Sequence, residues 1–130
     1  MRRDLGRMAK ENYQKMIVWQ KSMATTVAVY KLCRKLPKTE LYGLQNQMKR
    51  AAVSIPSNIA EGQSRPSKKE FAYFLSIAKG SRAELETQLL LCVRLGFLAD
   101  TDISETIALL EEISKMLTAL IKNLVQSSKL

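Results

Sequence analysis

The sequence predicts an all-α protein that folds as one antiparallel up-down-up-down four-helix bundle. Apolar residues recur every three or four positions in four successive stretches, and no stretch alternates as a strand does. The 130 residues also include only five Gly and three Pro, too few for a fold built from many tight turns. We expect a polar, basic N-terminal extension over residues 1–16 and the bundle, as a single domain, over residues 17–127.

The first helix is predicted from Ile17 to Leu36, because Pro37 cannot continue it. Cations in its last turn interact favourably with the helix dipole. We expect one apolar stripe to face the core, formed by Trp19, Met23, Thr26 or Val27, Tyr30, Cys33 and Leu36.

The second helix is predicted from Thr39, a plausible N-cap, to Gly62, which we expect to cap its carboxyl end. Pro56 lies inside it and removes one main-chain donor. The apolar spacing continues through Pro56, which favours a kinked continuous helix over the alternative of a full break. The expected stripe is Leu41, Leu44, Met48, Ala51, Ile55 and Ile59.

The third helix is predicted to begin at Ser67, which forms a capping box with Glu70, and to end at Gly96. Gly80 falls in its middle, where glycine costs about 1 kcal/mol relative to alanine. Two interpretations stay open for Gly80: close approach of another backbone or a ligand, or a tolerated surface position. The expected inward residues are Phe71, Phe74 or Leu75, Ala78, Leu85, Leu89, Cys92 and Leu95.

The fourth helix is predicted to start near Thr101 or Asp102. Its first half is acidic, which suits the positive end of the helix dipole. The expected stripe is Ile103, Ile107, Leu110, Leu117, Leu120 or Ile121, and Leu124.

Composition excludes several kinds of chemistry. The sequence has no His, so it has no Ser-His-Asp or Cys-His pair and no His-ligated zinc. Cys33 and Cys92 are too few for a four-thiolate metal site, and we expect two buried thiols in a reducing cytosol. Glu61, Glu84 and Glu86 offer carboxylates to Mg²⁺, but nothing else in the sequence supports a metal enzyme. We therefore expect a non-enzymatic protein without metal or cofactor.

No apolar run approaches the roughly 18 residues that a membrane span needs. The longest run, Leu89–Val93, is followed by Arg94, and the basic N-terminus has no apolar stretch behind it. We therefore expect a cytoplasmic protein with no membrane partner.

The positive charge is unevenly distributed along the chain. The net charge is +9, and residues 1–60 hold 12 basic and three acidic side chains, whereas residues 61–130 hold nine of each. This asymmetry predicts an anionic partner, with RNA or DNA bound through phosphates and without sequence preference; the alternative is a surplus that only keeps the protein in solution. Only Tyr13, Tyr42 and Tyr73 are expected to expose rings for stacking, so the sequence gives little support for base recognition. The candidate nucleic-acid-binding residues are Lys31, Arg34, Lys35, Lys38, Lys49, Arg50, Arg65, Lys68 and Lys69.

Polar residues also line one side of the second and third predicted helices. Helical spacing places Arg50, Ser54, Asn58 and Glu61 on one face, and Ser81, Glu84 and Gln88 on another. Two such stripes on adjacent helices are expected to hydrogen-bond across the seam, with an Arg–carboxylate pair satisfying both charges. The sharper interpretation is a ligand or subunit site, and the alternative is a structural network that fixes register.

The most distinctive sequence in the chain lies in these same two helices. It runs from Glu40 to Gly62, including Ser-Ile-Pro-Ser-Asn-Ile-Ala-Glu-Gly, and continues with Arg65, Glu70–Ser81 and Glu84–Glu86. It resembles the four-helix-bundle proteins encoded in intervening sequences of bacterial 23S rRNA genes, which are often labelled a ribosomal protein family. The resemblance covers roughly residues 18–98; the fourth helix matches only in pattern, and residues 1–16 fall outside. The matched signature positions are Arg50, Ser54, Asn58, Glu61, Arg65, Gly80, Ser81 and Glu84.

The resemblance implies a homo-oligomer, a pentamer of four-helix bundles around a central axis with a basic surface. It implies packing or assembly, rather than RNA contact, as the role of the signature positions. A related accessory protein of diversity-generating retroelements binds a reverse transcriptase and nucleic acid. Two hypotheses follow: an oligomeric bundle that binds nucleic acid, or an assembly or adaptor module that acts through protein partners such as a reverse transcriptase.

Overall fold

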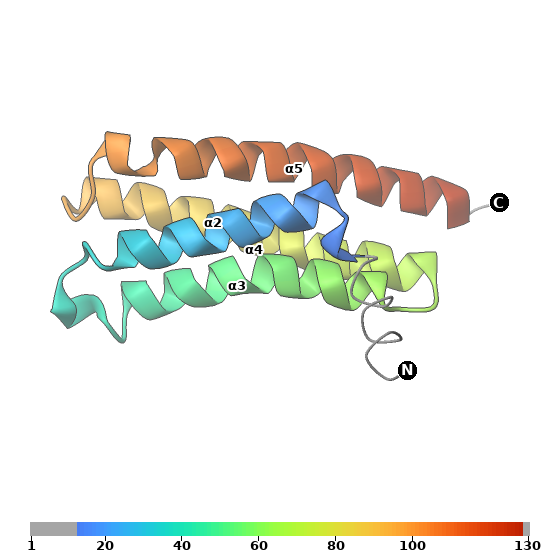
Figure 1. Cartoon of the computed structure of the whole chain (residues 1–130), viewed down its shortest axis with the longest axis horizontal. Coiled ribbons are helices and arrows are strands. Elements are labelled where there is room, and N and C mark those ends of the chain that lie inside the picture. Colours follow the sequence, from blue (N-terminus) through green and yellow to red (C-terminus); the bar gives the residue numbers. More distant parts are fainter. Residues whose placement is uncertain (1–12, 129–130) are drawn as a thin grey trace.

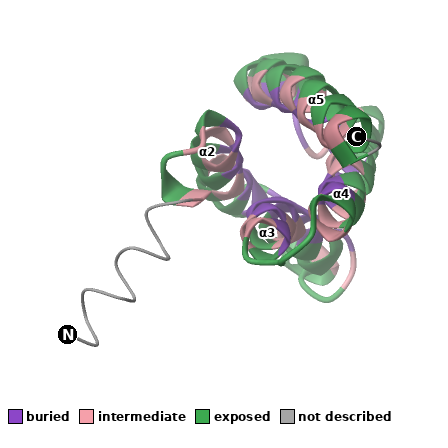
Figure 2. Ribbon diagram, turned by 90° about the vertical axis from the view of Figure 1, so that its right-hand side faces the viewer, coloured by how far each residue is buried: buried purple, intermediate pink, exposed green. Residues whose placement is uncertain are grey.

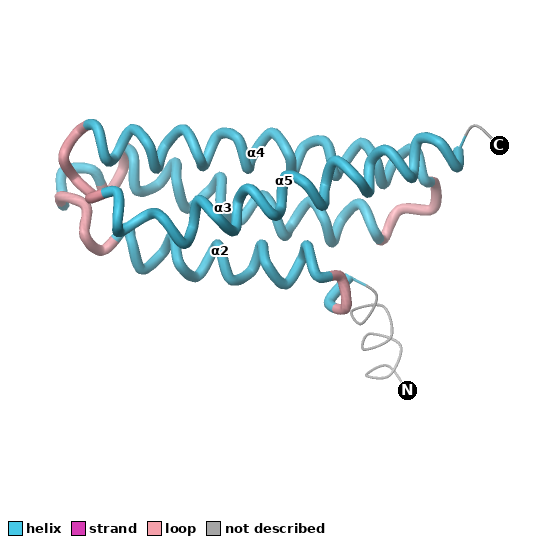
Figure 3. The backbone as a smooth tube through the Cα atoms, turned by 90° about the horizontal axis from the view of Figure 1, so that it is seen from above, coloured by secondary structure: helices cyan, strands magenta, loops and turns pink. Residues whose placement is uncertain are grey.

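The computed structural model describes residues 13–128, which form four long α-helices and one short 3-10 helix. The helices are α2 (Ile17–Cys33), α3 (Leu44–Gln63), α4 (Lys68–Arg94) and α5 (Asp100–Ser128), with η1 (Lys38–Glu40) between α2 and α3. Each long helix packs against two neighbours, and the ring closes where α2 meets α5 (Figure 1). The connections lie only at the two ends of the bundle, so neighbouring helices run antiparallel (Figure 3). The predicted all-α up-down bundle is confirmed.

The core runs along the inside of this ring (Figure 2). Burying each large aliphatic side chain contributes about 1.5–3 kcal/mol. Two predicted core residues are wrong, because Leu41 and Leu95 are 47% and 54% exposed near helix ends. None of the helices within residues 13–128 is both long and apolar enough to cross a membrane. The largest fully buried side chains include Met48, Ile55, Ile59, Leu75, Leu85, Leu89, Leu110, Ile113 and Leu117.

The buried face of α2 differs from the predicted stripe. Met23 and Tyr30 are 41% and 43% exposed, so these core predictions are wrong; of the alternatives Thr26 and Val27, Thr26 is half-buried and Val27 is 53% exposed. The hydroxyl groups of Ser22 and Thr25 donate to main-chain carbonyls one turn earlier, at 2.6 and 2.8 Å. Both residues can therefore be buried without an unsatisfied donor, and the true core face includes positions that the apolar pattern scores as polar. The buried residues of α2 are Val18, Ser22, Thr25, Val29, Leu32 and Cys33.

Two helix ends differ from the prediction. Helix α2 ends at Cys33 rather than Leu36, because the next three amides donate to carbonyls only three residues earlier. Helix α3 begins at Leu44 rather than after Thr39, because Gly43 has φ −101° and ψ −110°, outside the helical region.

Helix α3 continues through Pro56 without a break, as the favoured interpretation predicted. Pro56 has no N–H to give to the carbonyl of Ala52. The hydroxyl of Thr26 in α2 lies 3.0 Å from that carbonyl oxygen and 2.9 Å from the Ser22 carbonyl oxygen, and its one proton is shared between these two acceptors. A side chain of the neighbouring helix thus satisfies the acceptor that proline leaves free.

Glycines and caps set the helix ends around α4. The Ser67 hydroxyl accepts from the Glu70 amide at 3.1 Å and donates to the Glu70 carboxylate at 3.0 Å, so Ser67 caps α4 as predicted. Gly96 has φ +80° and terminates α4 as predicted. Gly62 is not a cap: it lies inside α3, and a Cβ there would be 2.8 Å from the Cβ of Phe74. Within the described chain, no atom lies within 4 Å of a Cβ built on Gly80, so close approach at that position is not seen.

Candidate functional site

The fold collects the positive charge on the side of the bundle formed by α2 and α3. Residues 17–60, which form α2, η1 and most of α3, hold seven basic side chains and one acidic one. Residues 68–128, which form α4 and α5, hold seven basic and eight acidic side chains. Because α2 and α3 are neighbours, one side of the bundle is strongly positive and the other is almost neutral.

Among the described residues, two ion pairs link α2 and the turn that follows it to α5. Lys21 pairs with Glu112, and Lys35 Nζ lies 2.7 Å from Asp102 Oδ1. The hydrogen bond from Lys35, followed by one from the Ala99 amide, lowers the pKa of the Asp102 carboxyl. Lys35, predicted to bind nucleic acid, therefore already has an acidic partner, and both pairs lie on the α5 side of α2.

On its other side, α2 packs against the first half of α3 around a hollow of about 440 Å³. Lys49 Nζ lies 5.1 Å from the centre of the Tyr30 ring, within cation–π range. Lys31, Arg34 and Lys38 are exposed and form no ion pair with any residue in the range 13–128. We name the basic face as Lys31, Arg34, Lys38, Lys49 and Arg50. The hollow is lined by Tyr30, Asn46, Lys49, Arg50, Val53 and Ser54.

The remaining predicted cations lie at the opposite end of the bundle. Lys68 and Lys69 open α4 and are exposed. Arg65 pairs with Glu61, and its guanidinium lies 4.9 Å from the ring centre of Phe74. The structure therefore does not bring these three residues together with the basic face.

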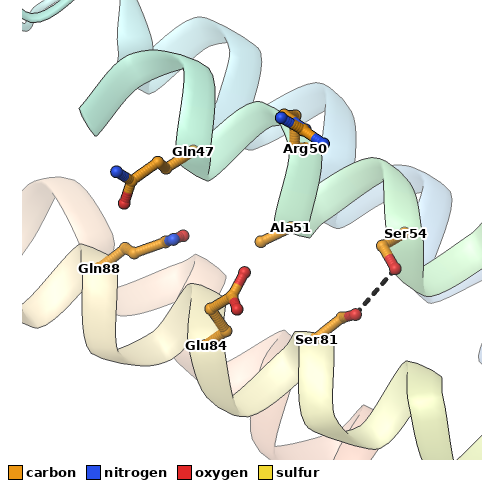
Figure 4. Close-up of a pocket in the computed structure, with 7 residues that line it drawn as sticks. All are labelled: Gln47, Arg50, Ala51, Ser54, Ser81, Glu84 and Gln88. Atoms are coloured by element: carbon orange, nitrogen blue, oxygen red, sulfur yellow. Dashed lines mark hydrogen bonds between the residues drawn. The ribbon is translucent and has the colours of Figure 1, made fainter. Parts of the chain in front are cut away.

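The polar stripes of α3 and α4 face each other across a groove of about 490 Å³ (Figure 4). Ser54 Oγ of α3 lies 2.8 Å from Ser81 Oγ of α4, a hydrogen bond that crosses the seam. Asn58 Nδ2 donates to Ser54 Oγ at 2.9 Å and so orients that hydroxyl. The groove is lined by Gln47, Arg50, Ala51, Ser54, Ser81, Glu84 and Gln88.

The Arg–carboxylate pair predicted across this seam does not form. Arg50 and Glu84 both line the groove, but no ion pair joins them. Glu61 and Glu86 instead pair with arginines four residues away along the chain. The carboxylates considered as magnesium ligands are therefore held in separate places, and residues 13–128 contain no group of three potential metal ligands.

Gln88 presents an unsatisfied acceptor in the groove. The residue is 8% exposed, and its side-chain oxygen has no hydrogen-bond partner within the described chain. Figure 4 shows the Gln88 and Glu84 side chains reaching from α4 into the space below Ala51. Gln47, which the prediction omitted, also lines the groove; its position three residues before Arg50 places it on the same face.

The two thiols are buried, as predicted, and are free. Burial raises the pKa of Cys33, against an opposing effect of Lys49. Burial, with smaller contributions from Cys33 and Glu40, raises the pKa of Cys92 to about 11. Since the thiolate is the nucleophilic form, neither cysteine is activated for chemistry at neutral pH.

The sequence matches the model of one protein family, described as 23S rRNA-intervening sequence protein, over residues 14–119. The chain belongs to this family. The residues that match the 23S rRNA-intervening sequence proteins include most of α5. From the sequence alone, this helix resembled the family only in its apolar pattern.

A solved structure of the family has the same fold. It is a protein of unknown function from the S23 ribosomal protein family of Bacteroides thetaiotaomicron, with a TM-score of 0.76 and 27% sequence identity. The alignment covers 82% of this chain and 99% of that one. None of the curated proteins matches the sequence.

Most signature positions of this 23S rRNA-intervening sequence protein gather at the α3–α4 seam. Arg50, Ser54, Ser81 and Glu84 line the groove, and Asn58 supports it through Ser54. These signature positions therefore meet at a surface groove with polar groups of both charges, where hydrogen bonds join Asn58, Ser54 and Ser81.

Proposed function

We propose that this protein is a non-enzymatic, cytoplasmic binding protein that holds RNA or DNA by its phosphate groups on the basic face. The observation that carries the proposal is the set of exposed cations on α2, the following turn and α3 that have no acidic partner among residues 13–128. Cations of this kind release counterions when they meet phosphates, which is the main source of sequence-independent affinity.

The arrangement of charge favours a nucleic-acid partner over a surplus that only maintains solubility. Glu112 and Asp102, the acids that pair with Lys21 and Lys35, both come from α5. The cations of the basic face have no ion-pair partner within residues 13–128, and the exposed ring of Tyr30 lies beside Lys49. An exposed ring next to cations supports stacking of an unpaired base together with phosphate contact.

Homo-oligomerisation would strengthen this binding. The family resemblance implies a pentamer, and a pentamer would present five copies of the basic face to one nucleic acid. Each additional face raises the effective local concentration of cations, so weak single contacts combine into useful avidity.

A second candidate function is an adaptor that acts through a protein partner such as a reverse transcriptase. It is favoured by a hollow of about 360 Å³ between α2 and α3, farther from the turn that joins them. Met23 and Val53, which line this hollow, are 41% and 40% exposed, an arrangement typical of contact surfaces. The hollow is lined by Tyr13, Trp19, Met23, Thr26, Val53, Pro56, Ser57 and Ala60.

Two triple variants with the same net charge separate phosphate binding from a bulk charge effect. The first replaces Arg34, Lys38 and Arg50 of the basic face with Ser. The control replaces Lys79, Lys115 and Lys122 of α4 and α5 with Ser. Affinity for a labelled RNA and a duplex DNA is measured across a salt series, with light scattering on the same samples to give the mass.

The first variant should reduce the slope of log affinity against log salt by about 2–3, since each phosphate contact contributes roughly 0.9. The control should keep the wild-type slope. Equal losses in both variants would show that only net charge matters. No binding by the wild-type protein, even at low salt, would leave the adaptor function.

A further inference from the structure

Within the described residues, the groove between α3 and α4 offers hydrogen-bond acceptors that receive no donor. Gln88 Oε1 is buried without a partner, and Glu84 has no ion-pair partner within residues 13–128. A buried acceptor without a donor is energetically costly, and an incoming N–H group would remove that cost. The groove therefore selects a ligand with hydrogen-bond donors.

The charge around the groove restricts that ligand further. A simple cation such as a polyamine fits poorly, because a protein of net charge +9 would repel it. Arg50 lines both this groove and the hollow beside Lys49 on the basic face. A ligand that carries N–H donors on one part and negative charge on another fits this arrangement, and a nucleotide within a nucleic acid has both.

Among the four bases, guanine matches a carboxylate best. Its Watson–Crick edge carries two adjacent donors, N1–H and the 2-amino group, which one carboxylate accepts together. Adenine and cytosine place an acceptor beside their amino group, and uracil places acceptors on both sides of its N–H. A pair of parallel hydrogen bonds to a charged group provides both strength and geometric selectivity.

We infer that the α3–α4 groove binds an unpaired guanine, with Glu84 accepting from its Watson–Crick edge and Gln88 accepting a further N–H. Arg50 holds the neighbouring phosphate and so connects the groove to the basic face. This inference rests on the proposed nucleic-acid function and adds base selectivity to it. Unpaired bases are the usual target of base-specific RNA recognition, because their edges are free.

The test uses labelled oligouridylates of about 12 nucleotides, within the range of single-strand binding sites. One carries a single central guanosine, one carries inosine at that position, which lacks the 2-amino group, and one is uridine throughout. Fluorescence anisotropy measures their affinities for the wild type and for Glu84→Gln. The matched control is Glu111→Gln, the same change of charge at an exposed position of α5.

We expect the guanosine oligomer to bind about tenfold more tightly than oligouridylate, and inosine to lose most of this preference. Glu84→Gln should abolish the preference and keep the binding of oligouridylate, whereas Glu111→Gln should keep both. Equal binding of all three oligomers, or a preference that survives Glu84→Gln, would overturn the guanine site and leave phosphate binding intact. Binding of no oligomer would overturn both proposals. If Glu84→Gln changes the mass in light scattering and not the preference, the groove is a contact between copies of this chain and the inference is wrong.

Discussion

Helices α3 and α4 pack tightly at Gly62, and alanine at this position tests that contact. An alanine Cβ would lie 2.8 Å from the Cβ of Phe74, 3.0 Å from Cδ1 of Phe71 and 3.2 Å from the Phe71 carbonyl oxygen. Favourable carbon–carbon contacts have separations of about 3.5–4.0 Å. A Cβ and a carbonyl are fixed to the main chain, so relief requires the two helices to move apart.

Two effects of opposite sign decide the stability of Gly62→Ala. Alanine gains about 1 kcal/mol of helix propensity over glycine, while overpacking a tight contact costs about 1–3 kcal/mol, and more when main chain must shift. Because the contacted atoms are main chain or next to it, we expect the packing cost to dominate. The variant should lose about 1–2 kcal/mol of unfolding free energy.

Gly80→Ala provides the matched control within the same bundle. Gly80 is exposed in the middle of α4, and an added Cβ there meets no atom within 4 Å. Only the propensity gain remains, so this variant should be more stable by up to about 1 kcal/mol. Urea unfolding followed by circular dichroism at one fixed protein concentration should lower the midpoint of Gly62→Ala by about 0.5–1 M and raise that of Gly80→Ala. Wild-type or higher stability of Gly62→Ala would refute the close contact, and destabilisation by Gly80→Ala would show that another molecule covers that position.

Two further predictions concern single polar contacts. Thr26→Val removes the donor to the Ala52 carbonyl and should cost about 1–3 kcal/mol in thermal or urea unfolding, whereas Thr26→Ser should cost much less. In a Pro56→Ala background the restored amide replaces that donor, so an undiminished cost would contradict the role of Thr26. Asp102→Asn should lower the melting temperature at pH 7, because the pKa of Asp102 is lower in the folded protein and its ionised form therefore stabilises the fold. This stabilisation is fully present above the pKa of Asp102 in the unfolded chain, and it disappears as pH falls through the pKa in the folded protein, which is below 3.8. A difference in melting temperature from wild type that persists at pH 2 would refute the pairing with Lys35.

Helix number, order and most of the core followed from the sequence because aliphatic residues repeat at helical spacing in α3 and α5. The same rule failed in α2, where Ser22 and Thr25 occupy core positions. Their hydroxyls donate to main-chain carbonyls of their own helix, so these polar residues can be buried. The spacing of apolar residues does not detect such positions. The error moved Tyr30 into the predicted core, although its exposed ring lies beside Lys49.

The polar groove was predictable only in part. Helical spacing placed Ser54 and Ser81 on faces that could meet, and they do meet across the seam. The spacing of residues along one helix does not determine how far apart side chains on two helices lie. That distance depends on how the two helices cross and on the conformation of each long side chain. For that reason the predicted pair between Arg50 and a carboxylate of α4 is absent, and the unsatisfied oxygen of Gln88 had no signal in the sequence.

The charge asymmetry also constrains how copies of this chain can pack together. If two basic faces met, their unpaired cations would repel each other unless an anion lay between them. The α4–α5 side holds nearly equal numbers of acids and bases, so it can approach another copy without that penalty. A closed ring of copies is therefore expected either to keep the basic faces away from its contacts or to gather them around a bound nucleic acid. High salt should weaken an assembly whose basic faces gather around a nucleic acid, and it should weaken nucleic-acid binding at the same time. It should leave intact an assembly whose contacts exclude the basic faces. Light scattering with and without RNA distinguishes the two.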